Sequence, residues 1–245
     1  MAFLSRKSTE NKLPDVLPEH IGFIMDGNGR WAKRKGLPRS FGHREGAKNF
    51  KKIVRYCKNI GIKNISFYAF STENWKRPKE EIDVIMDLFR EYIVDVRKHL
   101  SENTRMIFLG DKSVFDDDLR EKMIKLEEDT KDYKEMNLLM AVNYGGRDEI
   151  AYVARQLAQK AKDGLINPED ITEKTIDEHL YSKGIPDVDL IIRPSGELRL
   201  SNFLIWQSAY AEYYFTDIMW PDFTPKELDK ALIDFANRGR RFGGV

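Results

Sequence analysis

The sequence predicts an α/β fold in which one mostly parallel central sheet is flanked by helices. From about residue 20 onward, short apolar runs alternate with segments whose apolar residues recur at helical spacing. Several of these runs are continuous rather than alternating, which is typical of strands buried on both faces. A sustained alternation of this kind favours parallel strands joined by helices. In such sheets ligands bind beyond the carboxyl ends of the strands, so we expect a site in the loops that follow the strands.

Five strands are expected, because each is an apolar run bounded by turn residues. They cover residues 20–25, 65–70, 106–109, 138–142 and 188–192, with two shorter candidates at 203–206 and 215–220.

Helices are expected between these strands, where apolar residues lie three and four positions apart. They cover about residues 47–61, 82–96, 116–128, 150–164 and 228–235. The helix at 82–96 has a wide apolar stripe that could line a cavity beside the strand ends, although such a stripe is more often plain core.

Length, charge and cysteine content limit the class of protein. The 245 residues include 41 Lys and Arg against 40 Asp and Glu, so no nucleic-acid partner is expected, since such partners usually require a basic excess. Cys57 is the only cysteine, which excludes an intrachain disulfide and fits a reducing cytosol. The longest apolar run has five residues, against the about 20 that a membrane-spanning helix needs. We expect a soluble cytoplasmic protein with a flexible segment at 1–18 and a single domain over 19–245.

The loops after three of the expected strands share one chemistry, which is that of anion binding. The first contains Asp26, Gly27, Asn28, Gly29 and Arg30, with Arg39 and His43 close behind; the second contains Ser71, Asn74 and Arg77; the third contains Arg193, Ser195, Arg199 and Ser201. Arginine forks match phosphate oxygens, and glycines let backbone N–H groups approach them. One carboxylate among such donors is a usual way to hold Mg²⁺. The residues therefore indicate a magnesium–diphosphate site. The arginines outnumber what one phosphate group needs, which indicates two diphosphates or one long polyanion.

Each residue also has a purely structural interpretation. Asp26 alone would more often cap a turn, and a single arginine is more often part of a surface ion pair. The acidic run at 116–118 is interpreted as a solvated helix face and not as a metal box. Only the combination at consecutive strand ends favours the functional interpretation.

Five ordered groups of residues carry a family resemblance. The first two are residues 20–32 and 42–47, and the next two are 68–75 with 77–78 and 143–147. The last group comprises 193–197, 199–203, 206–207, 209–212, 220–223 and 241–244. This series, from about His20 to the C-terminus, resembles the cis-prenyltransferase family and most closely its bacterial undecaprenyl diphosphate synthases. The resemblance implies a parallel sheet with an apolar tunnel, and a homodimer in which the tail at 241–244 reaches the neighbouring subunit's site.

The resemblance also implies the reaction. A Mg²⁺-dependent enzyme would condense isopentenyl diphosphate units onto an allylic diphosphate, expected to be farnesyl diphosphate, to make a long polyprenyl diphosphate such as undecaprenyl diphosphate. That product is the lipid carrier precursor for cell-wall synthesis. We expect a cytoplasmic enzyme that contacts the inner face of the membrane transiently to release its product.

The roles that the resemblance implies fall into four groups. Asp26 and Glu212 would bind Mg²⁺, and Asp26 and Asn74 would be catalytic, with Asn74 a proposed proton acceptor. Binding of the allylic diphosphate and completion of the reacting centre would fall to Gly27, Asn28, Gly29, Arg30, Trp31, Arg39, His43, Ser71, Thr72, Glu73, Trp75 and Arg77. Binding of isopentenyl diphosphate would fall to Arg193, Arg199, Leu200 and Ser201. The tunnel lining is expected to include Ala69, Met86, Phe89 and Leu139.

Three other classes of protein share part of this pattern. An aspartyl-phosphate phosphohydrolase also begins with an apolar strand that ends in Asp, but it needs a second acid where this chain has Asn28. A trans-prenyltransferase is all-helical with paired acidic boxes, which the strands oppose and which Asp117 and Asp118 do not complete. A phospholigand-binding or scaffold protein would explain the arginines but not the acid among them.

Overall fold

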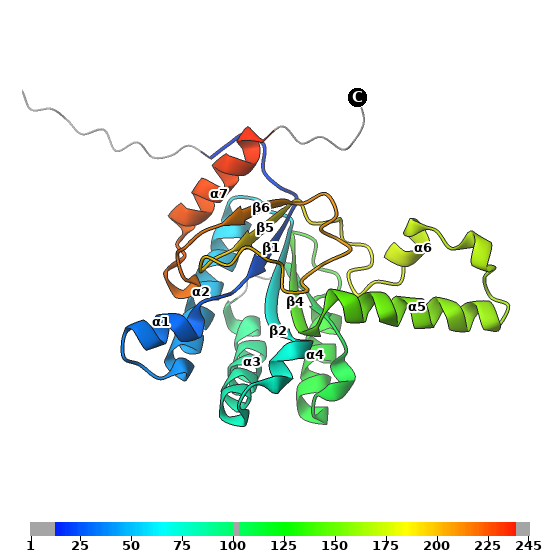
Figure 1. Ribbon diagram of the computed structural model, residues 1–245, viewed down its shortest axis with the longest axis horizontal. Coiled ribbons are helices and arrows are strands. Elements are labelled where there is room, and N and C mark those ends of the chain that lie inside the picture. Colours follow the sequence, from blue (N-terminus) through cyan, green and yellow to red (C-terminus); the bar gives the residue numbers. More distant parts are fainter. Residues whose placement is uncertain (1–12, 100–102, 239–245) are drawn as a thin grey trace, which may run out of the picture.

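A single parallel sheet forms the centre of the molecule, as predicted. The computed structural model describes residues 13–99 and 103–238, and the six strands lie in the order β3-β4-β2-β1-β5-β6, with every neighbouring pair parallel. The strands are β1 (His20–Ile24), β2 (Asn64–Ser71), β3 (Thr104–Leu109), β4 (Met136–Tyr144), β5 (Leu190–Arg193) and β6 (Glu212–Phe215). Figure 1 shows them at the middle of the fold.

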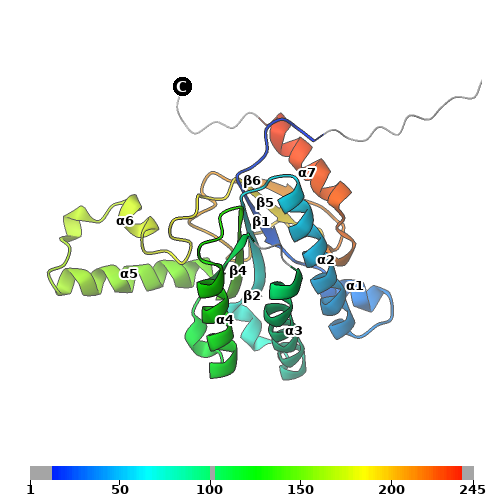
Figure 2. The ribbon, with the colours of Figure 1, turned by 180° about the vertical axis from the view of Figure 1, so that it is seen from behind.

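Helices cover one face of this sheet. The helices are α1 (Asn28–Arg34), α2 (Arg39–Asn59), α3 (Lys79–His99), α4 (Asp117–Thr130), α5 (Gly146–Lys162), α6 (Glu173–Asp177) and α7 (Pro225–Asn237). Residues of α2, α3, α4 and α7 share one apolar cluster with alternate residues of β1, β2 and β4, and Figure 2 shows these helices in front of the sheet. No helix in the described part of the chain is long and apolar enough to cross a membrane.

The opposite face is covered largely by an irregular segment. Phe203 and Leu204, both fully buried, pack there against Leu139, Ala141 and Ile191. Helix α5 projects sideways from this layer together with α6 (Figure 1). The continuous apolar runs of the strands are explained, because alternate side chains enter the cluster under the helices and the cluster under this segment.

The irregular segment replaces one of the predicted strands. The prediction of a strand at 203–206 was wrong, since residues 201–210 form turns. Ser201, Asn202 and Leu204 have φ angles of 49°, 67° and 43°, a left-handed conformation that no extended strand contains. The other short candidate, at 215–220, overlaps β6 only at Phe215.

Helix α1 was also missed, because Gly27 at its N-cap and Asn28 and Gly29 in its first turn are typical turn residues. The acidic run at 116–118 was interpreted correctly as a surface feature. Asp116 accepts a hydrogen bond from the Leu119 amide and caps the N-terminus of α4, while Asp118 pairs with Lys122 at 2.6 Å. The expected flexible segment at 1–18 and the tail at 241–244 lie largely or wholly outside the described residues.

A buried histidine joins β1 to β2. His20 is 1% exposed; its Nδ1 lies 2.7 Å from the Pro186 carbonyl oxygen, and its Nε2 lies 2.7 Å from Ser66 Oγ. Because a carbonyl oxygen only accepts, Nδ1 donates to it, and Nε2 of the neutral ring accepts from the Ser66 hydroxyl. Burial lowers the pKa of His20 to about 4 and outweighs the opposing effect of the Pro186 carbonyl and of Asp189.

This histidine makes the stability depend on pH. Its folded pKa lies below the unfolded value, so the unfolded chain binds a proton first and stability falls as the pH drops from 6.5 toward 4. The expected loss by pH 4 is about 3 kcal/mol. Denaturant unfolding of the wild type and of His20→Asn at pH 7 and pH 4 measures it, because the variant lacks this contribution. Equal losses of stability in the wild type and in His20→Asn between pH 7 and pH 4 would show that His20 is not the source of the loss.

Candidate active site

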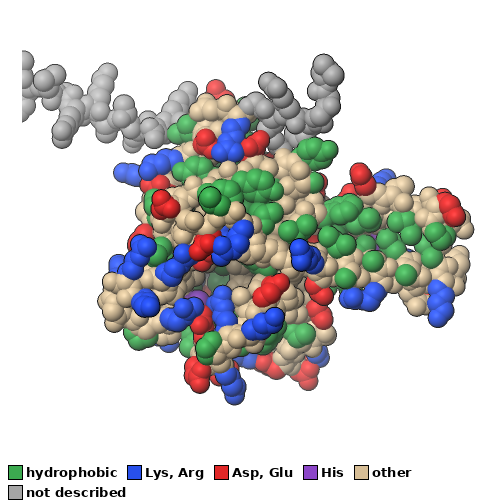
Figure 3. Space-filling view, in the orientation of Figure 1, with side chains coloured by type: hydrophobic (Ala, Val, Ile, Leu, Met, Phe, Trp, Pro, Cys, Tyr) green, Lys and Arg blue, Asp and Glu red, His purple; other side chains and the backbone are tan. Residues whose placement is uncertain are grey.

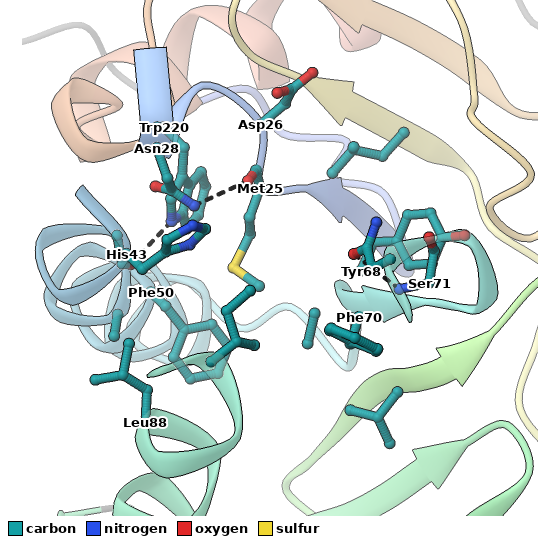
Figure 4. Close-up of a pocket in the computed structure, with 18 of the residues that line it drawn as sticks. Met25, Asp26, Asn28, His43, Phe50, Tyr68, Phe70, Ser71, Leu88 and Trp220 are labelled. Carbon is teal, nitrogen blue, oxygen red and sulfur yellow. Dashed lines mark hydrogen bonds between the residues drawn. The ribbon is translucent and has the colours of Figure 1, made fainter. Parts of the chain in front are cut away.

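A cavity of about 710 Å³ opens at the carboxyl ends of β1, β2 and β5. Its polar walls come from the loops after these strands, and its apolar walls come from α2, α3, β2 and β4. Figure 4 shows Asp26 and Asn28 toward one end and Phe50 and Leu88 farther from that end. Side chains of Lys, Arg, Asp and Glu border a hollow on the surface of the molecule (Figure 3). The cavity therefore combines a charged rim with an apolar interior.

Most of the residues that the sequence singled out lie in the wall of this cavity. They are Asp26, Gly27, Asn28, Gly29, Arg30, Arg39, His43, Ser71, Glu73, Asn74, Arg77, Arg193, Arg199 and Ser201. The carboxyl ends of β1, β2 and β5 bring them together although they are up to 175 positions apart in the sequence, from 26 to 201.

Asp26 lies at the end of β1, beside two arginines. Its Oδ2 accepts a hydrogen bond from Arg193 Nη2 at 2.9 Å, and its Oδ1 lies 3.3 Å from Arg30 Nη2. Burial alone would raise the pKa of Asp26, but the hydrogen bond and charge of Arg193, helped by Arg30 and the Gly27 amide, lower it below the usual value. The carboxylate is therefore charged at neutral pH.

Gly27 is required by the backbone at this turn. Its φ of 97° is left-handed, and a Cβ atom there would lie only 2.9 Å from the Cβ of Ser195. The turn points the Gly27 amide at Asp26 Oδ1, 2.6 Å away. The same turn begins α1, so that Asn28, Gly29 and Arg30 follow in the cavity wall.

The first arginine cluster surrounds Arg193, the last residue of β5. Arg193 is 3% exposed, and besides Asp26 its guanidinium contacts Ser201 Oγ at 2.8 Å and the carbonyl oxygen of Arg199. Glu197 pairs with Arg30 at 3.0 Å and also with Arg199. We call these five charged residues, Asp26, Arg30, Arg193, Glu197 and Arg199, the Arg193 cluster.

A second cluster lies between the start of α2 and the start of α3. Glu81 accepts hydrogen bonds from Arg39 Nε at 3.0 Å and Nη2 at 3.1 Å, from Arg77 Nη1 at 3.0 Å and from His43 Nε2 at 3.1 Å. We call these four residues the Glu81 cluster. Burial lowers the pKa of His43, partly opposed by the hydrogen bond to Glu81.

Sequence reasoning missed Glu81. The only signal in the sequence is its position four residues after Arg77, a short separation that allows an ion pair across the start of α3. The contacts with Arg39 and His43 depend on how α2 packs on α3. Glu197 belonged to a recognised motif but had been given no role.

Asn74 occupies a structural position at the end of β2. Its Oδ1 accepts a hydrogen bond from the Ser71 amide at 3.2 Å, where the strand enters a 3-10 helix over Thr72–Lys76. Glu73, on the same short helix, accepts a hydrogen bond from Asn202 at 3.1 Å. These contacts fix the side chains of this loop beside the cavity.

Three of the four residues that were expected in the tunnel lining lie in the apolar wall of the cavity. Ala69, Met86 and Phe89 line the cavity. The prediction that Leu139 lines the cavity was wrong. Leu139 belongs to the cluster on the opposite face of the sheet, while its neighbour Met140 lines the cavity. Successive residues of a strand point to opposite faces, so a shift of one position reverses the assignment.

Five of the predicted site residues lie outside the cavity wall. Trp31 packs against Met219, Trp75 donates its indole N–H to Asn143 Oδ1 at 2.8 Å, and Leu200 belongs to the cluster on the opposite face. Thr72 and Glu212 are the other two.

Glu212 begins β6 and is paired with Leu190, three residues before Arg193. A strand rises about 3.3 Å per residue, so Glu212 lies about 10 Å from Arg193 along the strand direction, toward the amino ends of the strands. Its carboxylate accepts a hydrogen bond from Arg238 Nη1 at 2.8 Å. Within one chain, therefore, the structure does not bring Glu212 to Asp26.

The residues present fit a magnesium ion held mainly by its substrate. The described residues contain no group of three or more His, Cys, Asp or Glu side chains that could hold a metal. Mg²⁺ is commonly held by one or two carboxylates together with substrate phosphates. Asp26, charged and in the cavity wall among arginines, supplies one such carboxylate.

Known proteins are similar to this chain both in sequence and in fold. The prenyltransferase family model described as undecaprenyl diphosphate synthase matches residues 24–243. An isoprenyl transferase of Clostridium perfringens is 47% identical over 249 residues, which cover 99% of this chain and 98% of the relative. An isoprenyl transferase of Fusobacterium nucleatum is 48% identical, covering 94% of this chain and 97% of the relative.

Two solved structures are also similar. Lavandulyl diphosphate synthase from Lavandula x intermedia, in complex with dimethylallyl diphosphate, has a TM-score of 0.90 and 35% identity. A probable undecaprenyl diphosphate synthase from Campylobacter jejuni has a TM-score of 0.77 and 35% identity. Each match covers 94% of this chain and all of the other chain. The chain therefore belongs to the undecaprenyl diphosphate synthase family and is a prenyltransferase, an enzyme of prenyl chain elongation.

Proposed function

We propose that this enzyme adds isopentenyl diphosphate units to farnesyl diphosphate in a Mg²⁺-dependent reaction, giving a long polyprenyl diphosphate such as undecaprenyl diphosphate. The observation that carries the proposal is the position of two arginine clusters beside one apolar cavity. Two cationic clusters match two diphosphates, and the apolar interior matches a prenyl chain. In a bacterium the product would serve as the lipid carrier precursor for cell-wall synthesis.

The Glu81 cluster is proposed to hold the allylic diphosphate. Arg39, His43 and Arg77 would donate to its oxygens, and the backbone of Gly27, with φ of 97°, would allow a close approach. When the allylic C–O bond breaks, negative charge builds on the departing diphosphate. Donors already in place stabilise that charge without reorganising, and this is the main contribution of these residues to the rate.

The Arg193 cluster is proposed to hold isopentenyl diphosphate. Arg193 and Ser201 are already hydrogen-bonded to one another, so the site is preorganised for a second anion. The double bond of isopentenyl diphosphate would then attack the allylic carbon as pyrophosphate leaves. Mg²⁺, bound through Asp26 and diphosphate oxygens, would supply further charge neutralisation there.

The proton lost from the new chain needs an acceptor. Asn74 Oδ1 already accepts a hydrogen bond from the Ser71 amide, and a carboxamide is a weak base. Diphosphate oxygens beside the reacting carbon are therefore proposed to share this role with Asn74.

Assembly and location are part of the proposal. A homodimer is supported by apolar side chains that are exposed within 203–215, namely Ile205 at 38% and Tyr210 at 66%. A cytoplasmic enzyme with transient contact at the inner face of the membrane is supported by the apolar nature of the proposed product. Glu212 as a second metal ligand stays a prediction.

Two rival functions have less support. The sheet opposes the all-helical trans-prenyltransferase fold. A phosphohydrolase needs an acid at position 28, where the Asn28 side-chain amide instead donates to the Met25 carbonyl at 3.2 Å.

A pyrophosphate-release assay tests the proposal and the need for metal. Farnesyl diphosphate, isopentenyl diphosphate and Mg²⁺ together are expected to give continuous release, because C–C bond formation requires both substrates. Each substrate alone should give none, and excess EDTA should stop the reaction. Orthophosphate released from a single diphosphate would instead support a phosphohydrolase, and undiminished pyrophosphate release in EDTA would refute the metal requirement.

A further inference from the structure

The Glu81 carboxylate occupies the donors that are proposed to bind the allylic diphosphate. Its two oxygens take the Nε and Nη2 edge of Arg39, one N–H of Arg77 and Nε2 of His43, all within 3.1 Å. Because a carboxylate only accepts, His43 Nε2 carries the proton of this hydrogen bond. The Glu81 side chain is only 10% exposed.

Glu81 imitates a phosphate group in this arrangement. The arginine fork fits a carboxylate and a phosphate in the same way, with two parallel N–H···O bonds. Burial alone would raise the pKa of Glu81, but the hydrogen bond from Arg39 and the charge of Arg77 lower it, so the group is an anion at neutral pH. A diphosphate that needs the same N–H groups must compete with this internal anion.

We propose that Glu81 is a competing carboxylate that expels pyrophosphate after each condensation. This inference rests on the proposed function, in which the bond from the allylic carbon to its diphosphate oxygen breaks and pyrophosphate is left on Arg39, His43 and Arg77. Another allylic diphosphate must then take its place before the next addition. Glu81 returns to Arg39, His43 and Arg77, and pyrophosphate leaves.

The apolar cavity explains why Glu81 expels the leaving group but not the substrate. An allylic diphosphate also buries its prenyl chain against residues such as Met86 and Phe89, and this burial adds affinity that offsets the loss of the Glu81 contacts. Pyrophosphate has no such chain. The internal carboxylate therefore discriminates between the bound substrate and the spent leaving group.

Calorimetric titration of pyrophosphate in the presence of Mg²⁺ tests the competition directly. Glu81→Gln keeps the size of the side chain and removes its charge. We expect it to bind pyrophosphate about 5- to 30-fold more tightly than the wild type, as removal of a charge-assisted competitor predicts. The matched control is Glu80→Gln, one position earlier on α3 and exposed, which should bind pyrophosphate like the wild type.

Kinetics give a second measurement that a purely structural role would not produce. In Glu81→Gln the KM for the allylic diphosphate should fall and kcat should fall with it, because pyrophosphate leaves more slowly. Glu81→Ala should show the same direction, and thermal unfolding shows whether either variant remains folded.

The outcomes separate this inference from the function on which it rests. Unchanged or weaker pyrophosphate binding in folded Glu81 variants would overturn the inference, because Glu81 would then support the arginines instead of competing for them. If neither the wild type nor the folded Glu81 variants bound pyrophosphate, the proposed diphosphate site would itself be refuted, and the inference with it. Tighter binding in both Glu81 variants, with no change in Glu80→Gln, supports the competition.

Discussion

Replacing Asp26 by alanine is expected to lower the rate of isopentenyl diphosphate incorporation by about 10²–10³-fold, the size of effect seen when one preorganised electrostatic group is removed. Asp26 is the acid beside both Arg193 and Arg30, and it is the proposed link between Mg²⁺ and the diphosphates. The substitution removes the proposed metal ligand and leaves Arg193, which is 3% exposed, without its carboxylate partner.

Asp26→Asn is the better-matched variant, because it keeps the shape of the side chain and one of its two acceptor oxygens while it removes the charge. It should lose nearly as much activity as Asp26→Ala while unfolding at a temperature closer to that of the wild type. Raising the Mg²⁺ concentration should restore part of its rate if the loss lies in metal binding. Full activity in Asp26→Asn would show that the charge of this side chain is not needed, which would contradict the metal role.

Arg193→Lys is expected to raise the KM for isopentenyl diphosphate strongly and to lower kcat/KM by about 10²-fold. Arg193 reaches Asp26, Ser201 and the Arg199 carbonyl at once through one planar guanidinium. A lysine keeps the charge but offers a single ammonium group, which cannot match this fork. The loss should appear in steady-state kinetics with isopentenyl diphosphate as the varied substrate.

Arg199→Lys is the matched control for this prediction. The Arg199 side chain is 61% exposed and pairs with Glu197, so a flexible cation at this position should serve nearly as well. The KM for isopentenyl diphosphate should therefore change less in Arg199→Lys than in Arg193→Lys. Equal effects of the two substitutions would mean that the buried fork has no special role.

The sequence predicted the sheet and most of the rim because both depend on local patterns. Apolar runs gave five of the six strands, and parallel topology places the residues after β1, β2 and β5 at one edge. That is why Asp26, Ser71 and Arg193 could be expected together although they are distant in the chain.

Contacts between elements could not be predicted in the same way. Glu81 meets Arg39 and His43 only because α2 packs against α3, and no residue spacing encodes that approach. Leu139 was assigned to the wrong face because an apolar run that is buried on both faces carries no alternation to set its register. The segment at 203–206 has the apolar composition of a strand, yet the left-handed backbone at Leu204 makes it a series of turns.

The most direct measurement is incorporation of labelled isopentenyl diphosphate. The purified chain is incubated with farnesyl diphosphate, labelled isopentenyl diphosphate and Mg²⁺, and the butanol-extractable products are sized by thin-layer chromatography. Products many isoprene units long are predicted, because the cavity of about 710 Å³ that holds residues of both arginine clusters in its wall has an apolar interior. No incorporation with any allylic primer or divalent metal would contradict the proposed reaction.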